Sequence, residues 1–514
     1  MPEEPLLQVR DLTVALPGGD VVVSHADLDL AAGEVVALVG PSGAGKTTIL
    51  RAILYPEDLR EAGYTVTTAR RVIEAPFAIV PQRGALFDHL DVAGNIEIAQ
   101  LANARDPAPG KWLEAVELGP DLAKRGRSVA ALSGGQAQRV AVARTLAAGR
   151  RILVLDEPSV GLDPLGVRNL ARLLARQARE QRIGILLVTH DLALAGGASD
   201  RILFLDSSAK TLKALPAGED AGPAELLEEP QRRRAISDLE RRVEALLLDT
   251  RGAPSLTAKQ PREPTLGALR VAGGALVTAL HPRLLGPSFR VLWRATSQSM
   301  FRPMPFYVVV GLLLGATVPY VIAHISDDLR PAAVLRLVGG TYVLALAPAL
   351  SAILFAATSG SAVNAWLGGL QLHRQMQAME GLGIPAARYI WSPTWCALVI
   401  AYLVVAAVFA ASMLVGGWAL FDFYGVPHAL AVVTSDFVHP PGHRMPYLVR
   451  GGWLVTAYAF LLASIAVARG ASHKNSSEQV TRAMTTSVIQ STLWVVVLEL
   501  ATIALTFWLT GKHA

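Results

Sequence analysis

The chain has 514 residues, too many for one hydrophobic core, so two or more domains are expected. Lys and Arg number 47 against 42 Asp and Glu, and this small excess forms no continuous basic stripe, which argues against nucleic acid as a partner. The single cysteine, Cys396, excludes an intrachain disulfide and a cysteine-based metal site. Charged sequence up to about residue 285 gives way to long apolar runs, which predicts a soluble half and a membrane half.

The first predicted elements are strands, because residues 6–30 alternate apolar and polar side chains, as in an antiparallel β-region. A short apolar strand is then expected at 34–39 and a helix from residue 48. Between them lies Gly40-Pro-Ser-Gly-Ala-Gly-Lys-Thr47, which fits the phosphate-binding pattern G-x-x-x-x-G-K-[ST]. The pattern therefore predicts a nucleotide-binding loop between a strand and a helix.

In such a loop, backbone N–H groups and the helix N-terminus face phosphate oxygens. Lys46 is expected to reach the β- and γ-phosphates, and the Thr47 hydroxyl to bind Mg²⁺. The nucleotide-binding residues predicted here are Gly40, Ser42, Gly43, Gly45, Lys46, Thr47 and Thr48.

Further motifs follow predicted strands along the chain. Gln82 ends the buried strand expected at 77–82, and Leu132-Ser-Gly-Gly-Gln136 opens a helix. Asp156 and Glu157 end the strand that begins at 151, and His190 ends the strand that begins at 183. A strand-end aspartate typically holds Mg²⁺, so we assign Asp156 to the metal together with Thr47, and Glu157 to the attacking water.

This order of motifs over residues 6–206 resembles the ATP-binding-cassette (ABC) ATPases. The resemblance implies an α/β P-loop fold with an antiparallel β-subdomain and a helical subdomain, and ATP and Mg²⁺ as cofactors. It implies that Gln82 completes the metal and water contacts, that His190 is the γ-phosphate switch, and that Asp163 couples two sites across a dimer. Leu16 or Pro17 stands where the family usually has an adenine-stacking aromatic, so an apolar contact can replace the stacking there. Ser133, Gly135 and Gln136 are implied to bind the ATP held by a second copy.

The region after the ATPase motifs is expected to be a linker with one amphipathic helix. Apolar residues recur at helical spacing from Ile236 to Leu247 among charged ones. Such a helix can dock on the ATPase domain, or it can bind a partner or a membrane surface. We place the domain boundaries at 1–210 for the nucleotide-binding domain, 211–285 for the linker and 286–514 for the membrane domain.

The membrane domain is predicted to be all-α, with an interfacial helix followed by five spans. Glu499 lies mid-span, where a carboxylate is costly, so it is either functional or hydrogen-bonded to a neighbouring helix. The absence of a basic and apolar leader at residues 1–5 predicts that the ATPase half stays in the cytosol. The expected spans are 304–325, 336–357, 389–418, 450–469 and 486–511.

Residues 347–362, 367–389 and 470–489 resemble the permeases of the Mla and MCE lipid-transport systems. The resemblance implies that 371–382 form a coupling helix that docks on the ATPase. The chain departs from the family pattern at Thr358, Trp366, Arg374 and Gln377, where the family carries charged residues.

Together these resemblances imply a half-transporter that works as a homodimer in the bacterial inner (cytoplasmic) membrane and uses ATP to move phospholipid. Membrane lipids and a separate extracytoplasmic MCE-domain protein are the expected partners. Two alternatives remain open: a stand-alone exporter of another hydrophobic substrate, and a mechanotransmitter that moves no cargo.

Overall fold

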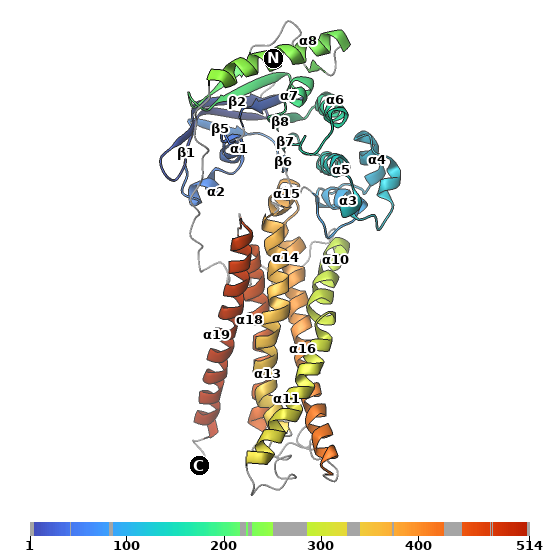
Figure 1. The fold of residues 1–514 in the computed structure, drawn as a ribbon, viewed down its shortest axis with the longest axis vertical. Coiled ribbons are helices and arrows are strands. Elements are labelled where there is room, and N and C mark those ends of the chain that lie inside the picture. Colours follow the sequence, from blue (N-terminus) through green and yellow to red (C-terminus); the bar gives the residue numbers. More distant parts are fainter. Residues whose placement is uncertain are drawn as a thin grey trace. The chain divides into compact units, whose positions relative to one another are not determined.

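The computed structural model describes residues 5–510 apart from 42, 82–85, 216–222, 225–228, 250–284, 326–339, 373–374, 426–444, 473 and 475. It separates into two compact units. The α/β unit comprises residues 1–264 and 373–385, and the helical unit comprises 265–372 and 386–514. Figure 1 shows the elements of each unit.

The α/β unit is built on a six-stranded sheet of order β10-β9-β3-β8-β7-β6. Strands β9, β3, β8, β7 and β6 are parallel, and β10 is antiparallel to β9. The central strands are fully buried apolar runs, as expected for a parallel sheet covered on both faces. The strands are β3 (Val35–Val39), β6 (Phe77–Val80), β7 (Ile152–Asp156), β8 (Gly184–Val188), β9 (Arg201–Asp206) and β10 (Thr211–Leu215).

Alternate side chains of these strands enter two separate hydrophobic clusters, one on each face of the sheet. One cluster joins the sheet to the antiparallel β-subdomain, α1 and α2, and the other joins it to helices α3 to α8. The β-subdomain comprises β1 (Leu7–Ala15), β2 (Val21–Leu30), β4 (Thr65–Thr67) and β5 (Arg70–Ile73), which confirms the predicted antiparallel region. The helices are α1 (Lys46–Leu54), α2 (Pro56–Glu61), α3 (Val92–Ala102), α4 (Pro109–Ala115), α5 (Gly134–Ala147), α6 (Pro164–Gln181), α7 (Leu192–Ala198) and α8 (Glu229–Asp249).

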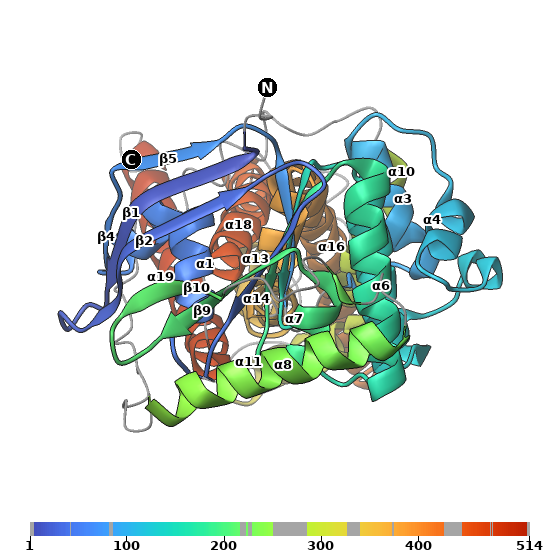
Figure 2. The same cartoon turned by 90° about the horizontal axis from the view of Figure 1, so that it is seen from above.

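Helix α8 is the amphipathic helix that the linker pattern predicts. Leu239 and Val243 are 8% and 2% exposed and belong to a core cluster of the α/β unit. In the view from above, α8 lies across this unit (Figure 2). Of the alternatives for this helix, docking on the ATPase domain is the arrangement in the structure.

The helical unit contains five helices long and apolar enough to cross a membrane, over the part of the chain that is described. These confirm the predicted number of spans. Short π-helical turns join several of the segments: Ser297–Phe301, Ala356–Gly360 and Ala387–Trp391. The helices are α10 (Leu285–Thr296), α11 (Met304–Ile325), α13 (Gly340–Phe355), α14 (Ser361–Leu372), α16 (Ser392–Phe423), α18 (Met445–Ala471) and α19 (Ser477–Thr510).

The boundary of the second span differs from the prediction. We expected it to end at 357, but the helix continues through the π-helical turn and α14 to Leu372. Thr358 donates to the carbonyl of Leu354 at 2.8 Å, and Ser361 donates to that of Ala357 at 2.5 Å. These polar side chains satisfy their hydrogen bonds within the helix, so they do not end it.

The last span shows the same effect. It was expected from 486, whereas α19 begins at Ser477. The hydroxyls of Thr481, Thr485 and Thr486 each donate to the carbonyl four residues earlier. Stretches rich in Thr and Ser therefore extend both spans beyond their purely apolar parts.

Helix α15 (Gln375–Gly381) belongs to the α/β unit, although its sequence lies between two helices of the helical unit. It is shorter than the predicted 371–382 segment, since Gln371 and Leu372 still belong to α14. A Cβ on Gly381 would lie 3.2 Å from the backbone nitrogen of Ile79 on β6, so a larger residue there would require the two backbones to move apart by a few tenths of an ångström. The amide of Asn103 donates to the carbonyl of Leu382 at 2.7 Å and fixes the end of this segment.

Candidate nucleotide-binding site

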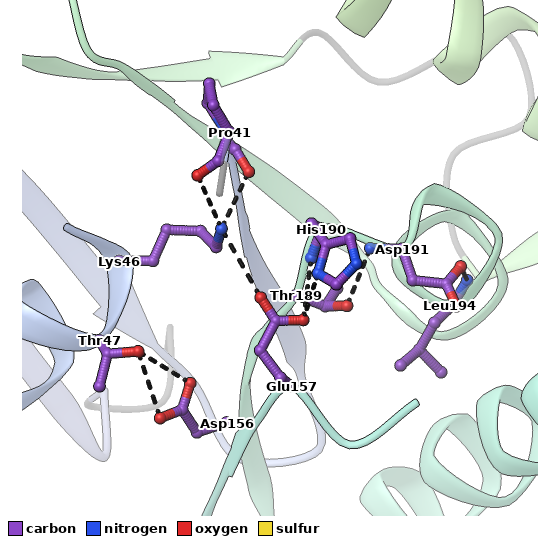
Figure 3. Close-up of polar contacts among 10 residues, drawn as sticks. Pro41, Lys46, Thr47, Asp156, Glu157, Thr189, His190, Asp191 and Leu194 are labelled. Carbon is purple, nitrogen blue, oxygen red and sulfur yellow. Dashed lines mark hydrogen bonds and ion pairs between the residues drawn. The ribbon is translucent and has the colours of Figure 1, made fainter. Parts of the chain in front are cut away.

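The candidate site lies at the carboxyl ends of β3, β8 and β7, which are neighbours in the sheet. The phosphate-binding loop follows β3, Glu157 follows β7, and His190 comes two residues after β8. Parallel strands present their carboxyl ends at one edge, where α/β sheets typically bind ligands. This topology brings together three motifs that are far apart in the sequence (Figure 3).

Gly45 connects the loop to helix α1. It is the N-cap residue of α1 and has φ 102°, in the left-handed region that favours glycine. A Cβ at this position would also collide with the side chain of Val22. Backbone conformation and space therefore both require glycine where the loop turns into the helix.

Lys46 is 6% exposed, and its ammonium group is held by loop carbonyls. Its Nζ donates to the carbonyls of Gly40 at 2.9 Å and Pro41 at 3.0 Å, and lies 3.6 Å from Glu157 Oε1. Burial lowers the pKa of Lys46, and the nearby Glu157 carboxylate partly opposes that shift. The site thus holds a largely desolvated cation that an anionic ligand would stabilise.

Glu157 lies between Lys46 and His190, as Figure 3 shows. Its φ of 51° is unusual for a residue other than glycine and costs about 1–3 kcal/mol, a strain that is typical of functional positions. Its Oε2 lies 2.6 Å from Nδ1 of His190, whose side chain is half exposed. A carboxylate held in this way can accept a proton from, or orient, a water molecule at the edge of the sheet.

Thr47 and Asp156 form a second polar pair beside the first. The Thr47 hydroxyl lies 3.2 and 3.3 Å from the two carboxylate oxygens of Asp156, which is almost fully buried. Hydroxyl and carboxylate oxygens are the hard ligands that Mg²⁺ prefers when phosphates supply the rest. Among the described residues, no cluster of three His, Cys, Asp or Glu side chains could hold a metal ion by itself. A site in which Thr47 and Asp156 share the metal with phosphate oxygens therefore fits this chain better.

The Leu-Ser-Gly-Gly-Gln motif begins helix α5. Ser133 is its N-cap and forms a reciprocal capping box with Gln136, at 3.3 and 3.1 Å. A Cβ on Gly135 would lie 2.9 Å from the side chain of Leu162, so glycine lets this helix start approach the segment before α6. Asp163 caps α6 by accepting from the Gly166 amide at 2.7 Å.

The structure does not place every predicted residue in the site. Ser42 and Gln82 lie outside the described residues. Thr48 is in the first turn of α1, next to Thr47. Leu16 is 8% exposed and packs in the cluster of the β-subdomain, so its side chain presents little surface to a base.

Arg144 is a feature that the motif analysis passed over. It is fully buried in α5, its guanidinium lies 4.2 Å from the ring centre of Phe87, and its Nη1 lies 3.3 Å from Asn95 Oδ1. Burial lowers its pKa to about 9. The Asn95 side chain accepts from the backbone N–H of Phe87 and donates to its carbonyl. Through Asn95 and Phe87, Arg144 therefore joins α5 to the segment that follows Gln82. An arginine on the apolar face of a predicted helix was the available signal.

Two family models match the chain: "ABC transporter" over residues 23–160 and "Permease MlaE" over residues 292–505. The chain is 35% identical over 224 residues to a zinc import ATP-binding protein ZnuC of Paracoccus denitrificans (strain Pd 1222), covering 43% of this chain and 83% of that protein. It is 35% identical over 206 residues to the L-cystine transport system ATP-binding protein TcyN of Escherichia coli (strain K12), covering 37% and 82%.

Among solved structures, cbiO1 from Clostridium perfringens matches with a TM-score of 0.36 and 22% identity, over 48% of this chain and all of that one. The dimeric bacterial ABC transporter cassette MJ0796 matches with a TM-score of 0.34 and 23% identity, over 41% and 100%. The family model for the ABC transporter covers the part of the chain that contains the phosphate-binding loop and Glu157 of the strand-end site. The chain belongs to the ABC transporter family and joins an ABC ATPase domain to a permease domain of the MlaE type.

Proposed function

We propose that this protein is an ATP-driven lipid transporter of the bacterial inner membrane that works as a homodimer. The observation that carries the proposal is the match of residues 292–505 to the MlaE permease model, on the same chain as an ABC ATPase domain. Phospholipid is the proposed cargo, and a separate MCE-domain protein is the proposed extracytoplasmic partner.

At the ATP site, Lys46 binds the β- and γ-phosphates and leaves its present contacts with loop carbonyls. Glu157 orients and polarises the attacking water, and His190, hydrogen-bonded to it at 2.6 Å, contacts the γ-phosphate. Mg²⁺ supplies charge neutralisation at the phosphates, and Thr47, Asp156 and Gln82 are the residues proposed to hold it. Cleavage then transfers the γ-phosphoryl group to water.

The Leu-Ser-Gly-Gly-Gln motif supports the proposed homodimer. It forms the N-terminus of α5, which begins with the capping box of Ser133 and Gln136, and a helix N-terminus favours an anion. We propose that this helix start, with Gly135, binds the γ-phosphate held by the other subunit, and that Asp163 lies at the same interface. A two-fold axis would then generate two equivalent ATP sites.

Helix α15 is proposed to transmit the movement of the ATPase to the membrane. It packs on β6 within the α/β unit, yet the chain on both sides of it belongs to the helical unit. The strand under it leads toward Gln82, so a rearrangement at the nucleotide would act on α15 directly. ATP shifts the population only if it binds the closed dimer better than the open one.

The test is purification of the detergent-solubilised chain from its native membrane, with mass spectrometry of bound lipid and protein, followed by reconstitution into phospholipid vesicles. Co-purified phospholipid and MCE-domain protein, with ATP-dependent lipid movement that Glu157→Gln abolishes, would support the proposal. The Glu157→Gln protein serves as the matched control, since it keeps the fold and the membrane domain.

Other outcomes would favour the alternatives. A homodimer that moves another hydrophobic compound and binds no MCE-domain protein would indicate a stand-alone exporter. ATP hydrolysis that moves no lipid, but changes the state of a bound extracytoplasmic protein, would indicate a mechanotransmitter.

A further inference from the structure

His190 lies directly before Asp191, the N-cap residue of helix α7. The Asp191 side chain accepts from the Leu194 amide at 3.1 Å, while the Asp191 amide donates to Thr189 Oγ1 at 3.0 Å. Thr189 is fully buried and its amide donates to the carbonyl of Leu38 on β3 at 3.1 Å. His190 is therefore fixed by backbone anchors on both sides, one in the sheet and one in α7.

Helix α7 has seven residues, too few for a helix that is stable by itself. Its position must come from packing, and Leu194, Ala195 and Ala198 are fully buried in a core cluster. The same cluster includes Leu239 and Val243 of α8.

The contact between α7 and α8 is close at Gly196. A Cβ there would lie 2.8 Å from Leu239 Cδ2 and 3.7 Å from Ile236 Cγ1. The two helices lie side by side in Figure 2. The linker sequence thus provides part of the core that holds α7, although no ATPase motif lies in it.

We propose that α8 is a positioning element for the ATP site, in which Leu239 and Val243, packed on α7, hold His190 in contact with Glu157. This inference rests on the proposed role of His190 in hydrolysis. Undocking of α8 lets the N-terminal end of α7 shift, and with it the His190 ring, whereas the phosphate-binding loop after β3 keeps its position. The expected signature is a loss of turnover without a loss of ATP binding.

The experiment measures steady-state ATP hydrolysis by the full chain in lipid nanodiscs for Leu239→Ala and for Gly196→Leu. The first removes apolar contact with α7. The second replaces glycine by a better helix former, so α7 is not weakened by propensity, while the added side chain forces α8 away from α7. A displacement of about 1 Å at a catalytic group can cost up to about 100-fold, so we expect kcat to fall about tenfold with KM changed less than about twofold. Leu28→Ala is the control, because it truncates a leucine in β2 that is 3% exposed against 8% for Leu239, and it should leave kcat near the parent value at matched folded protein.

Measuring kcat in the His190→Ala background distinguishes the proposed role of His190 in hydrolysis from the proposed positioning role of α8. If α8 acts through His190, Leu239→Ala should have no further effect on kcat once His190 is absent. Equal losses with Leu239→Ala and Leu28→Ala, or additive effects in the His190→Ala background, would overturn the positioning role. Full activity of His190→Ala alone would instead overturn the proposed role of His190.

Discussion

Among the described residues, each unit contains a largely buried ion pair, and the two pairs differ in their hydrogen-bond partners. In the α/β unit, Lys46 and Glu157 are 3.6 Å apart, with side chains 6% and 11% exposed. In the helical unit, Arg450 of α18 hydrogen-bonds directly to Glu499 of α19, with side chains 10% and 15% exposed. Glu499 thus bonds to a neighbouring helix, one of the two alternatives for this mid-span carboxylate.

The difference lies in the other partners. Lys46 also bonds two loop carbonyls, and Glu157 also bonds His190, so neither charge depends on the other alone. Arg450 adds only a side-chain contact, to Thr502 at 3.2 Å, among the bonds described for it. The first pair is loose enough for a phosphate to enter, while the second joins two membrane helices. Similar burial is therefore found at the candidate ATP site in one unit and at a contact between two helices in the other.

The largest effect is expected in the helical unit. Arg450→Met leaves Glu499 buried without its counter-charge, which should cost about 3–5 kcal/mol of unfolding free energy. Thermal unfolding in detergent measures the loss. The double variant with Glu499→Leu should recover most of it, and failure to recover would show that the pair does more than join α18 to α19.

For the pair of Lys46 and Glu157, the substitution Glu157→Gln is expected to reduce activity and not stability. It should lower kcat for ATP hydrolysis by about 100- to 1000-fold, because the charge that orients water is lost. Its melting temperature should stay at or above that of the parent, because Lys46 retains its carbonyl partners. Phosphate release and calorimetry measure the two quantities, and a marked drop in stability would remove the contrast between the pairs.

Lys46→Met should weaken ATP binding by about 10- to 100-fold, since it removes a charge-assisted contact to phosphate. Burial lowers the pKa of Lys46, so loss of this amine should not lower the melting temperature. Titration with a fluorescent ATP analogue gives the affinity. Arg51→Met, on the same helix, is the control for removing a cation near the loop.

The ion pair of Lys213 and Asp206, in which the lysine side chain is half exposed, shows how small the contribution of a more exposed pair should be. Lys213 and the Ser208 and Ala209 amides hold the pKa of Asp206 below its usual 3.8. Its contribution, about 1 kcal/mol or less, is therefore present above pH 3.8 and is lost as pH falls through the folded-state pKa. Melting temperatures of the parent and Asp206→Asn should differ slightly at neutral pH and converge as pH falls below the folded-state pKa of Asp206. A constant difference would assign the effect to packing.

Much of the ATP site was predictable because its chemistry is local. A phosphate-binding loop needs glycines, lysine and threonine at fixed short spacing. The sequence of residues 40–47 is therefore enough to predict the loop without any tertiary information. The same holds for a carboxylate pair directly after an apolar strand. The span count was predictable too, since hydrocarbon thickness sets helix length.

Other features depended on partners distant in sequence. Strand order decided that Glu157 meets both Lys46 and His190. In the sequence, Arg450 is the first residue of the expected span 450–469, and only helix packing made it the partner of Glu499. Local motif chemistry was therefore determined by the sequence itself, whereas the pairing of charges and the docking of α8 and α15 were decided by tertiary structure, because burial and hydrogen bonding depend on which surfaces meet.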